Sequence, residues 1–248
     1  MATPVIEAGD VQADSGGATT SPDPEHQAYV AGDLLIQFLG GDDDLATDSL
    51  TAPANGPNGE TLIVSSVGSG GHATTGPVTG VIAWVGNDTV AAGTLTWARG
   101  NAESWSGRCI KIPAGEFDSV TPIGTVSTHQ GNSDSSGTTA PTPTMTAGAS
   151  DGSGKILVCI CVDLITFTGT VSGWTILQNI DDGGQGCGVV VRDAAASNSE
   201  SISSVDYTVA NDSSSCIGLI VRDPDAAAGG HPVNPFGHAL NGPLGGPM

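Results

Sequence analysis

Residues 32–39, with the sequence GDLLIQFL, decide the fold class of this 248-residue chain. The apolar run is opened by Gly32-Asp33 and closed by Gly40-Gly41, which predicts a buried strand followed by a loop. Turn-rich segments separate further candidate strands at residues 61–67, 78–85, 93–97 and 106–112. No 11-residue window has apolar residues at i, i+3, i+4 and i+7, so the sequence predicts an all-β protein.

The same pattern returns in the second half of the chain. A four-stranded unit of about 70–80 residues leaves one sheet face bare and is marginally stable by itself. We therefore expect an eight-stranded antiparallel jelly roll or β-sandwich, formed from two sequence-similar four-stranded halves that share one core. The matching segments are 32–36 with 154–158, 80–85 with 188–192, and 108–113 with 215–220.

These repeats predict three regions along the chain. Residues 1–28 are rich in Asp, Ser, Gly, Thr and Pro and are expected to form an extended N-terminal arm that buries no core. Residues 29–223 are expected to form a single sandwich, with halves 29–113 and 154–223 joined by a connector at 114–153. Residues 224–248 are expected to form an extended C-terminal arm.

The C-terminal arm carries isolated apolar side chains among Gly, Pro and Ala. No acidic or basic residue follows Asp225, apart from two histidines. The segment is too rich in Gly and Pro to bury large side chains against itself, so we expect it to bind neighbouring subunits as an extended peptide. A frayed terminus that contacts nothing is the alternative. The expected partner-binding residues are Val233, Phe236, Leu240 and Leu244.

The charge balance excludes several classes of partner. The chain has 26 acidic and 6 basic residues, which gives a formal net charge of -20. A surface this acidic repels nucleic acid and anionic lipid, so neither is expected as a partner. No apolar run reaches the ~20 residues that span a bilayer, and residues 1–4 lack the start of a secretory signal. We expect a soluble protein made in a reducing cytoplasm.

The five cysteines show no C-x-x-C spacing. Cys159 and Cys161 are two residues apart in an apolar strand, so both point to one face and are interpreted as small buried hydrophobic groups. Metal ligation is the alternative, and we predict no metal site because structural zinc requires a closed tetrahedral ligand set. The other three cysteines are Cys109, Cys187 and Cys216.

No motif in the sequence points to catalysis. None of the five histidines lies beside Ser or Cys in a nucleophile motif, although a triad assembled in space stays open. Scarce aromatic residues argue against sugar hydrolysis. The acidic loops at 42–44 and 181–182 are weighed as calcium sites, and solvated loops are favoured because neither has EF-hand spacing. We predict a protein that is not an enzyme and has no cofactor.

Several of these segments together resemble tailed-bacteriophage virion proteins of jelly-roll type, over about residues 29–223. They are Gly32-Asp33-Leu34-Leu35-Ile36, Arg108-Cys109-Ile110-Lys111-Ile112, the Thr- and Pro-rich crossing, the second copy, and the tail at 231–237.

The resemblance implies a structural role in the virion, after synthesis in the host cytoplasm. The first hypothesis is a capsid decoration (cement) protein, expected as a trimer, that binds over contacts between major capsid proteins and stabilises the phage head. The second is a tail or tail-fibre component that binds a receptor or glycan. A free-standing carbohydrate-binding or hydrolytic domain is the third and is disfavoured.

Overall fold

The computed structural model describes twelve segments of the chain. Within them the protein is all-β, as the sequence predicted, and its one helical segment is a 3-10 turn, η1 (Ala8–Asp10). None of the described residues forms a helix long and apolar enough to cross a membrane. The described residues are 4–41, 49–68, 78–132, 139–140, 144–146, 151, 154–162, 174–181, 186–193, 199–201, 205–206 and 214–224.

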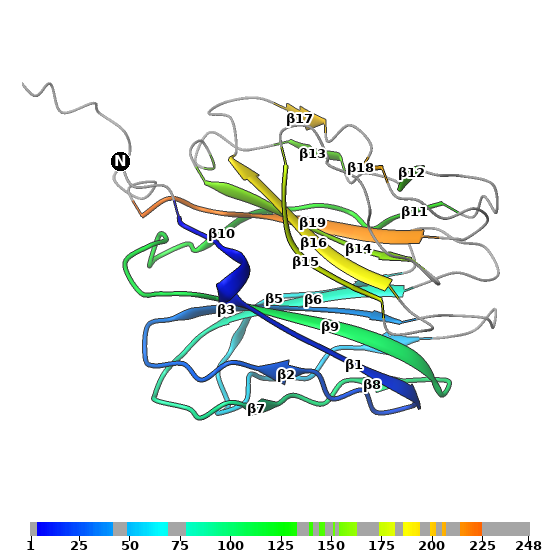
Figure 1. Cartoon of the computed structure of the whole chain (residues 1–248). Coiled ribbons are helices and arrows are strands. Elements are labelled where there is room, and N and C mark those ends of the chain that lie inside the picture. Colours follow the sequence, from blue (N-terminus) through cyan, green and yellow to red (C-terminus); the bar gives the residue numbers. More distant parts are fainter. Residues whose placement is uncertain are drawn as a thin grey trace, which may run out of the picture.

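Two antiparallel sheets face each other as a sandwich (Figure 1). The first sheet has the order β1-β9-β3-β6-β5, and its strands are β1 (Val11–Thr19), β3 (Leu34–Gly41), β5 (Leu62–Gly68), β6 (Val78–Val85) and β9 (Glu103–Ile112). The second has the order β10-β19-β14-β16-β15, with β11 also paired to β19. Its strands are β10 (Ile123–Val126), β11 (Gln130–Asn132), β14 (Lys155–Val162), β15 (Thr175–Asp181), β16 (Gly186–Asp193) and β19 (Ser214–Val221).

Short strand pairs lie outside the two sheets. The pairs β2-β7 and β4-β8 accompany the first sheet, and β2, β7 and β8 lie on the side of it that faces away from the second sheet (Figure 1). Their bounds are β2 (Glu25–His26), β4 (Leu50–Thr51), β7 (Gly93–Thr94) and β8 (Ala98–Arg99). On the far side of the second sheet lie β12 (Thr139–Ala140), β13 (Thr144–Thr146), β17 (Ser199–Ser201) and β18 (Val205–Asp206).

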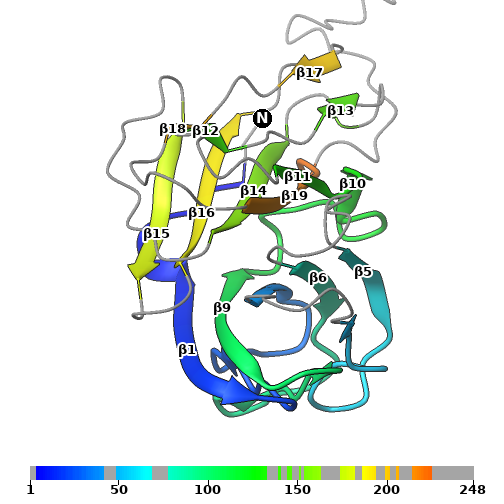
Figure 2. The same ribbon diagram turned by 90° about the vertical axis from the view of Figure 1, so that its right-hand side faces the viewer.

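Alternate residues of each long strand point into the core between the sheets. Ile36 and Ile110 of the first sheet pack in one cluster with Leu157, Val189 and Ile217 of the second. Figure 2 shows this layering in end view, with β14, β16 and β19 above β6 and β9. Burial of this apolar surface is the main favourable term in the folding free energy.

A second core lies on the outer face of the first sheet. Leu35, Ile82 and Trp84, which alternate with the residues of the first core, pack there against Tyr29 and Trp97. Both faces of β3 and β6 are therefore buried, which explains why their sequences are continuous apolar runs instead of alternating ones.

The N-terminal segment departs from the sequence prediction. Instead of an arm that buries no core, it contributes β1, which pairs with β9 along the edge of the first sheet, with Val11 opposite Ile110. Ile6 and Val11 join the core between the sheets. The polar residues of β1 gave no strand signal, because this strand is held by backbone pairing while most of its side chains stay half-buried.

The connector at residues 114–153 also contributes to a sheet. Its strands β10 and β11 pair with β19, so they take the place at the edge of the second sheet that β1 takes in the first. Each sheet therefore gains edge pairing beyond the four strands predicted per half. Of the predicted C-terminal arm, residues 225–248 lie outside the described part of the chain.

Replacing Ile36 by Ala should lower the free energy of unfolding by about 2–5 kcal/mol, because it opens a cavity in the core shared by both sheets. Ile63→Ala is the matched control, since the Ile63 side chain is 44% exposed, and it should cost under about 1 kcal/mol. Urea unfolding of both variants measures the difference. Equal losses would contradict the assignment of Ile36 to a shared core.

Candidate functional site

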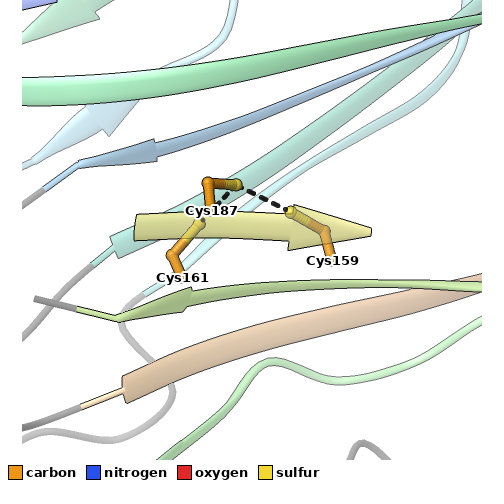
Figure 3. Close-up of side chains that lie close together, drawn as sticks. All are labelled: Cys159, Cys161 and Cys187. Atoms are coloured by element: carbon orange, nitrogen blue, oxygen red, sulfur yellow. Dashed lines mark hydrogen bonds between the residues drawn. The ribbon is translucent and has the colours of Figure 1, made fainter. Parts of the chain in front are cut away.

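Three cysteine side chains meet in the core between the sheets. Cys161 Sγ lies 3.0 Å and Cys159 Sγ 3.3 Å from Cys187 Sγ, and all three sulfurs lie within 4.8 Å of one another. Figure 3 shows the Cys187 sulfur between the other two. All three side chains are fully buried, and this is the only group of three His, Cys, Asp or Glu residues with such spacing among those described.

Strand pairing places these sulfurs. Cys161 of β14 lies directly opposite Cys187 of β16, and Cys159, two residues earlier, points to the same face. Gly40 of β3, on the facing sheet, leaves room for the thiols: a Cβ atom at Gly40 would lie 1.9 Å from Cys161 Sγ and 3.7 Å from Cys187 Sγ. A side chain at position 40 would therefore displace the cluster.

A buried arginine borders the cluster. Arg108 of β9 is fully buried, and its Nη2 donates a hydrogen bond of 2.5 Å to the carbonyl of Cys187, which joins the two sheets. Its Nη1 donates to Ser106 Oγ at 2.9 Å. Its Nε has no partner, and no carboxylate pairs with this guanidinium in the described part of the chain.

The environment divides the three thiols into two kinds. Hydrogen bonds with Cys159 and Cys161, together with the positive charge of Arg108, hold the pKa of Cys187 well below its usual range. Burial raises the pKa of Cys159 and of Cys161. The most acidic of the three thiols therefore lies beside a guanidinium, and soft metal ions bind the thiolate form of cysteine.

The other two cysteines lie apart from this cluster. Cys109 packs in the outer core, where burial raises its pKa to about 12, and Cys216 is buried in β19. All five cysteines are free and buried, and the burial of Cys159 and Cys161 agrees with the sequence prediction. The sequence also placed Cys159 and Cys161 on one face, but it gave no sign that Cys187 and Arg108 would join them.

A polar network around His129 forms a second candidate site. The His129 ring lies 3.0 Å from Ser66 Oγ through Nε2 and 3.0 Å from Thr79 Oγ1 through Nδ1. Thr79 in turn lies 3.0 Å from Ser215 Oγ, so the network joins the first sheet to the second. The sequence had left open whether a serine and a histidine come together in space as part of a triad.

The chemistry of this network differs from that of a catalytic triad. The position of the triad carboxylate, beside Nδ1, is taken here by the Thr79 hydroxyl. Burial lowers the pKa of His129 to about 4, which makes the ring a weak base near neutral pH. The network is better suited to linking the sheets than to activating Ser66.

The remaining candidates are placed as follows. The acidic loop at 42–44, residue 182, and the arm residues Val233, Phe236, Leu240 and Leu244 lie outside the described residues. A groove is lined by residues 28–30, 33, 89–91, 111 and 113. Its charged side chains bond to the backbone around it: Asp33 accepts from Val30 N–H, and Lys111 donates to the Ala28 carbonyl at 3.1 Å.

Comparisons with protein-family models, curated proteins and solved structures gave no match for this chain.

The low pKa of His129 predicts a pH dependence of stability. The unfolded imidazole titrates near ~6.5, so the unfolded state binds a proton before the folded state does. The contribution of His129 to the free energy of unfolding should be fully present above pH ~6.5. It should fall, by at most about 1.4 kcal/mol per pH unit, as the pH is lowered toward ~4.

His129→Gln, which can still form hydrogen bonds but does not titrate, isolates this effect. Urea unfolding from pH 7.5 to pH 4 should show a steeper loss for the wild type than for the variant. Parallel curves would show that His129 is as accessible to protons in the folded state as in the unfolded one.

Proposed function

We propose that this protein is a non-enzymatic virion component, a decoration protein that binds over contacts between major capsid subunits on the outside of a phage head. The resemblance of residues 29–223 to jelly-roll virion proteins suggests the class of protein. The distribution of charge in the fold supports the outer location. A trimer is the expected assembly.

The observation that carries the proposal is that all six basic side chains are wholly or partly buried. Each makes a polar or cation–π contact within the protein, while acidic side chains such as Asp23, Glu25 and Asp88 are exposed. The contacts are Arg99 to the Ser104 carbonyl, Arg108 to the Cys187 carbonyl, Lys111 to the Ala28 carbonyl, Lys155 to Asp193, Arg192 over the Trp174 ring, and Arg222 to Asp151.

The exposed charge is therefore almost entirely negative. A surface of this kind is repelled by packaged DNA, because its affinity for phosphate would have to come from exposed Lys and Arg. It is compatible with the outer face of a shell, where ions of the medium screen the charge. An inner, DNA-facing position is disfavoured for the same reason.

One edge of the sandwich offers a surface for such contacts. Strand β5 is the last strand of the first sheet, and its Ile63 and Val67 side chains are 44% and 40% exposed. An edge strand has unpaired backbone groups to which an extended segment of a neighbour can add. We propose that β5 is where a neighbouring subunit, through an arm such as residues 225–248, docks.

We also propose that the sandwich consists of two copies of one four-stranded unit, related to the jelly-roll class. The strand order supports this: β9-β3-β6-β5 in the first sheet corresponds, strand by strand along the chain, to β19-β14-β16-β15 in the second. The matched sequences at 32–36 and 154–158 open the corresponding strands β3 and β14.

Copy number in purified particles tests the proposal. A decoration protein should be present in hundreds of copies per particle, whereas a tail or tail-fibre component, the alternative, should be present in a few to tens. Quantitative mass spectrometry relative to the major capsid protein measures this. Absence of the protein from particles would refute both virion roles.

The docking role of β5 predicts the effect of charge on this edge. The double substitution Ile63→Glu and Val67→Glu should lower retention on particles at least tenfold. Burying each apolar side chain contributes ~1.5–3 kcal/mol, and a loss of about 1.4 kcal/mol corresponds to a tenfold loss of affinity. Sedimentation of particles after dilution measures retention.

Val120→Glu is the control, because Val120 is 76% exposed and belongs to the loop between β9 and β10, outside strand β5. Melting of the free protein should be nearly unchanged in all variants. Deleting residues 225–248 should likewise weaken retention without altering the melting of the sandwich. Full retention of the β5 variant would exclude this edge as the docking surface.

A further inference from the structure

We propose that Cys159, Cys161 and Cys187 form a binding site for one soft monovalent cation, Cu(I), with Arg108 offsetting the negative charge of the thiolates. This site is independent of the proposed role in the virion. It goes beyond the sequence interpretation of these cysteines as hydrophobic groups.

The ligand set has the geometry for a single ion. Three sulfurs bound to one ion at about 2.3 Å lie roughly 4 Å apart in a plane. In this cluster the shortest separation is 3.0 Å and all sulfurs lie within 4.8 Å, so binding needs only small side-chain rotations. The cysteines come from two paired strands, which hold their Cβ atoms in place.

The position of Arg108 distinguishes this cluster from an ordinary apolar core. A buried guanidinium is costly unless an anion accompanies it, and in the described part of the chain no carboxylate does so. The acidic groups close to it are the thiols. A set of thiolates holding a cation leaves a net negative charge, and the guanidinium beside the Cys187 carbonyl offsets one unit of it.

The chemistry of the donors selects the ion. Sulfur ligands favour Cu(I), Zn(II) and iron–sulfur clusters over calcium and magnesium, which prefer oxygen. Structural zinc takes four ligands, whereas the cluster in the described residues has three, among apolar side chains such as Phe38 and Val189. A soft ion that is satisfied by three sulfurs therefore fits best.

The site lies close to the strand ends. Gly40, opposite Cys161, provides the space that the Cys161 sulfur occupies, so no side chain of the facing sheet separates the three thiols. Cys161 is the second-last residue of β14, Cys187 the second of β16, and Gly40 the second-last of β3. The cluster thus lies at one end of the sandwich, where strand ends can open to admit an ion without separating the sheets.

Anaerobic titration of the reduced, full-length protein with Cu(I) in acetonitrile, in competition with a chromophoric Cu(I) chelator, tests the site. We expect one equivalent per chain and a higher melting temperature, because an ion that binds only the folded state stabilises it. X-ray absorption of the wild-type complex should show three sulfur ligands. Loss of all Cu(I) from the wild-type protein to the chelator would overturn the proposal. An X-ray absorption spectrum with nitrogen or oxygen ligands in place of three sulfurs would overturn it as well.

Matched cysteine variants locate the ion. Substituting a residue beside a metal ligand typically weakens metal affinity ~10–100-fold, and we expect Arg108→Met to fall within that range. Cys187→Ala removes a ligand itself and should weaken Cu(I) binding by more. Cys109→Ala, a buried cysteine outside the cluster, should bind as the wild type does. Melting curves without copper identify variants that are folded. Unchanged affinity in a folded Cys187→Ala protein would refute the assignment.

Discussion

The bond from the Arg108 guanidinium to the Cys187 carbonyl is the constraint on which the interior of this sandwich depends. It joins β9 of one sheet to β16 of the other through a charged group that is fully buried. A buried charge without hydrogen bonds would cost several kcal/mol, so the sheets must stack where Arg108 meets its acceptors. The same requirement brings three thiols and a positive charge together.

Other buried hydrogen bonds also fix the position of one layer of the structure relative to the next. Thr79 and Ser215 join the two sheets beside His129, and Gln37 accepts a hydrogen bond of 2.9 Å from Trp97 Nε1 beneath the first sheet. Apolar burial supplies most of the stability, but it is non-directional and changes little when the layers shift slightly against each other. These directional bonds define one arrangement of the layers.

The use of basic residues for internal contacts links the fold to the proposed function. Because the six Lys and Arg side chains make contacts within the protein and none is fully exposed, Asp and Glu supply most of the exposed charge. That surface suits a position outside a DNA-filled shell, and the apolar edge of β5 suits attachment to a protein neighbour. The interior contacts and the proposed choice of partner thus involve the same six basic residues.

The amino-acid sequence by itself determined the all-β class and most of the long strands, because continuous apolar runs such as those of β3 and β6 report burial directly. It also determined that Cys159 and Cys161 share a face, since side chains alternate along a strand. The proposed arm residues Val233, Phe236, Leu240 and Leu244 lie beyond the described chain and stay predictions.

Only the tertiary structure decided that the mostly polar residues 11–19 form an edge strand. Backbone pairing with β9 does not require apolar side chains, so the amino-acid composition of the segment gives no strand signal. It also decided the surroundings of Arg108. The alternation with Ile110 and Ile112 was a signal that this side chain points into the core, but its acceptor on the facing sheet, the Cys187 carbonyl, lies 79 residues away in the chain. Contacts between sheets depend on how two surfaces stack, and the local pattern of either strand does not contain that information.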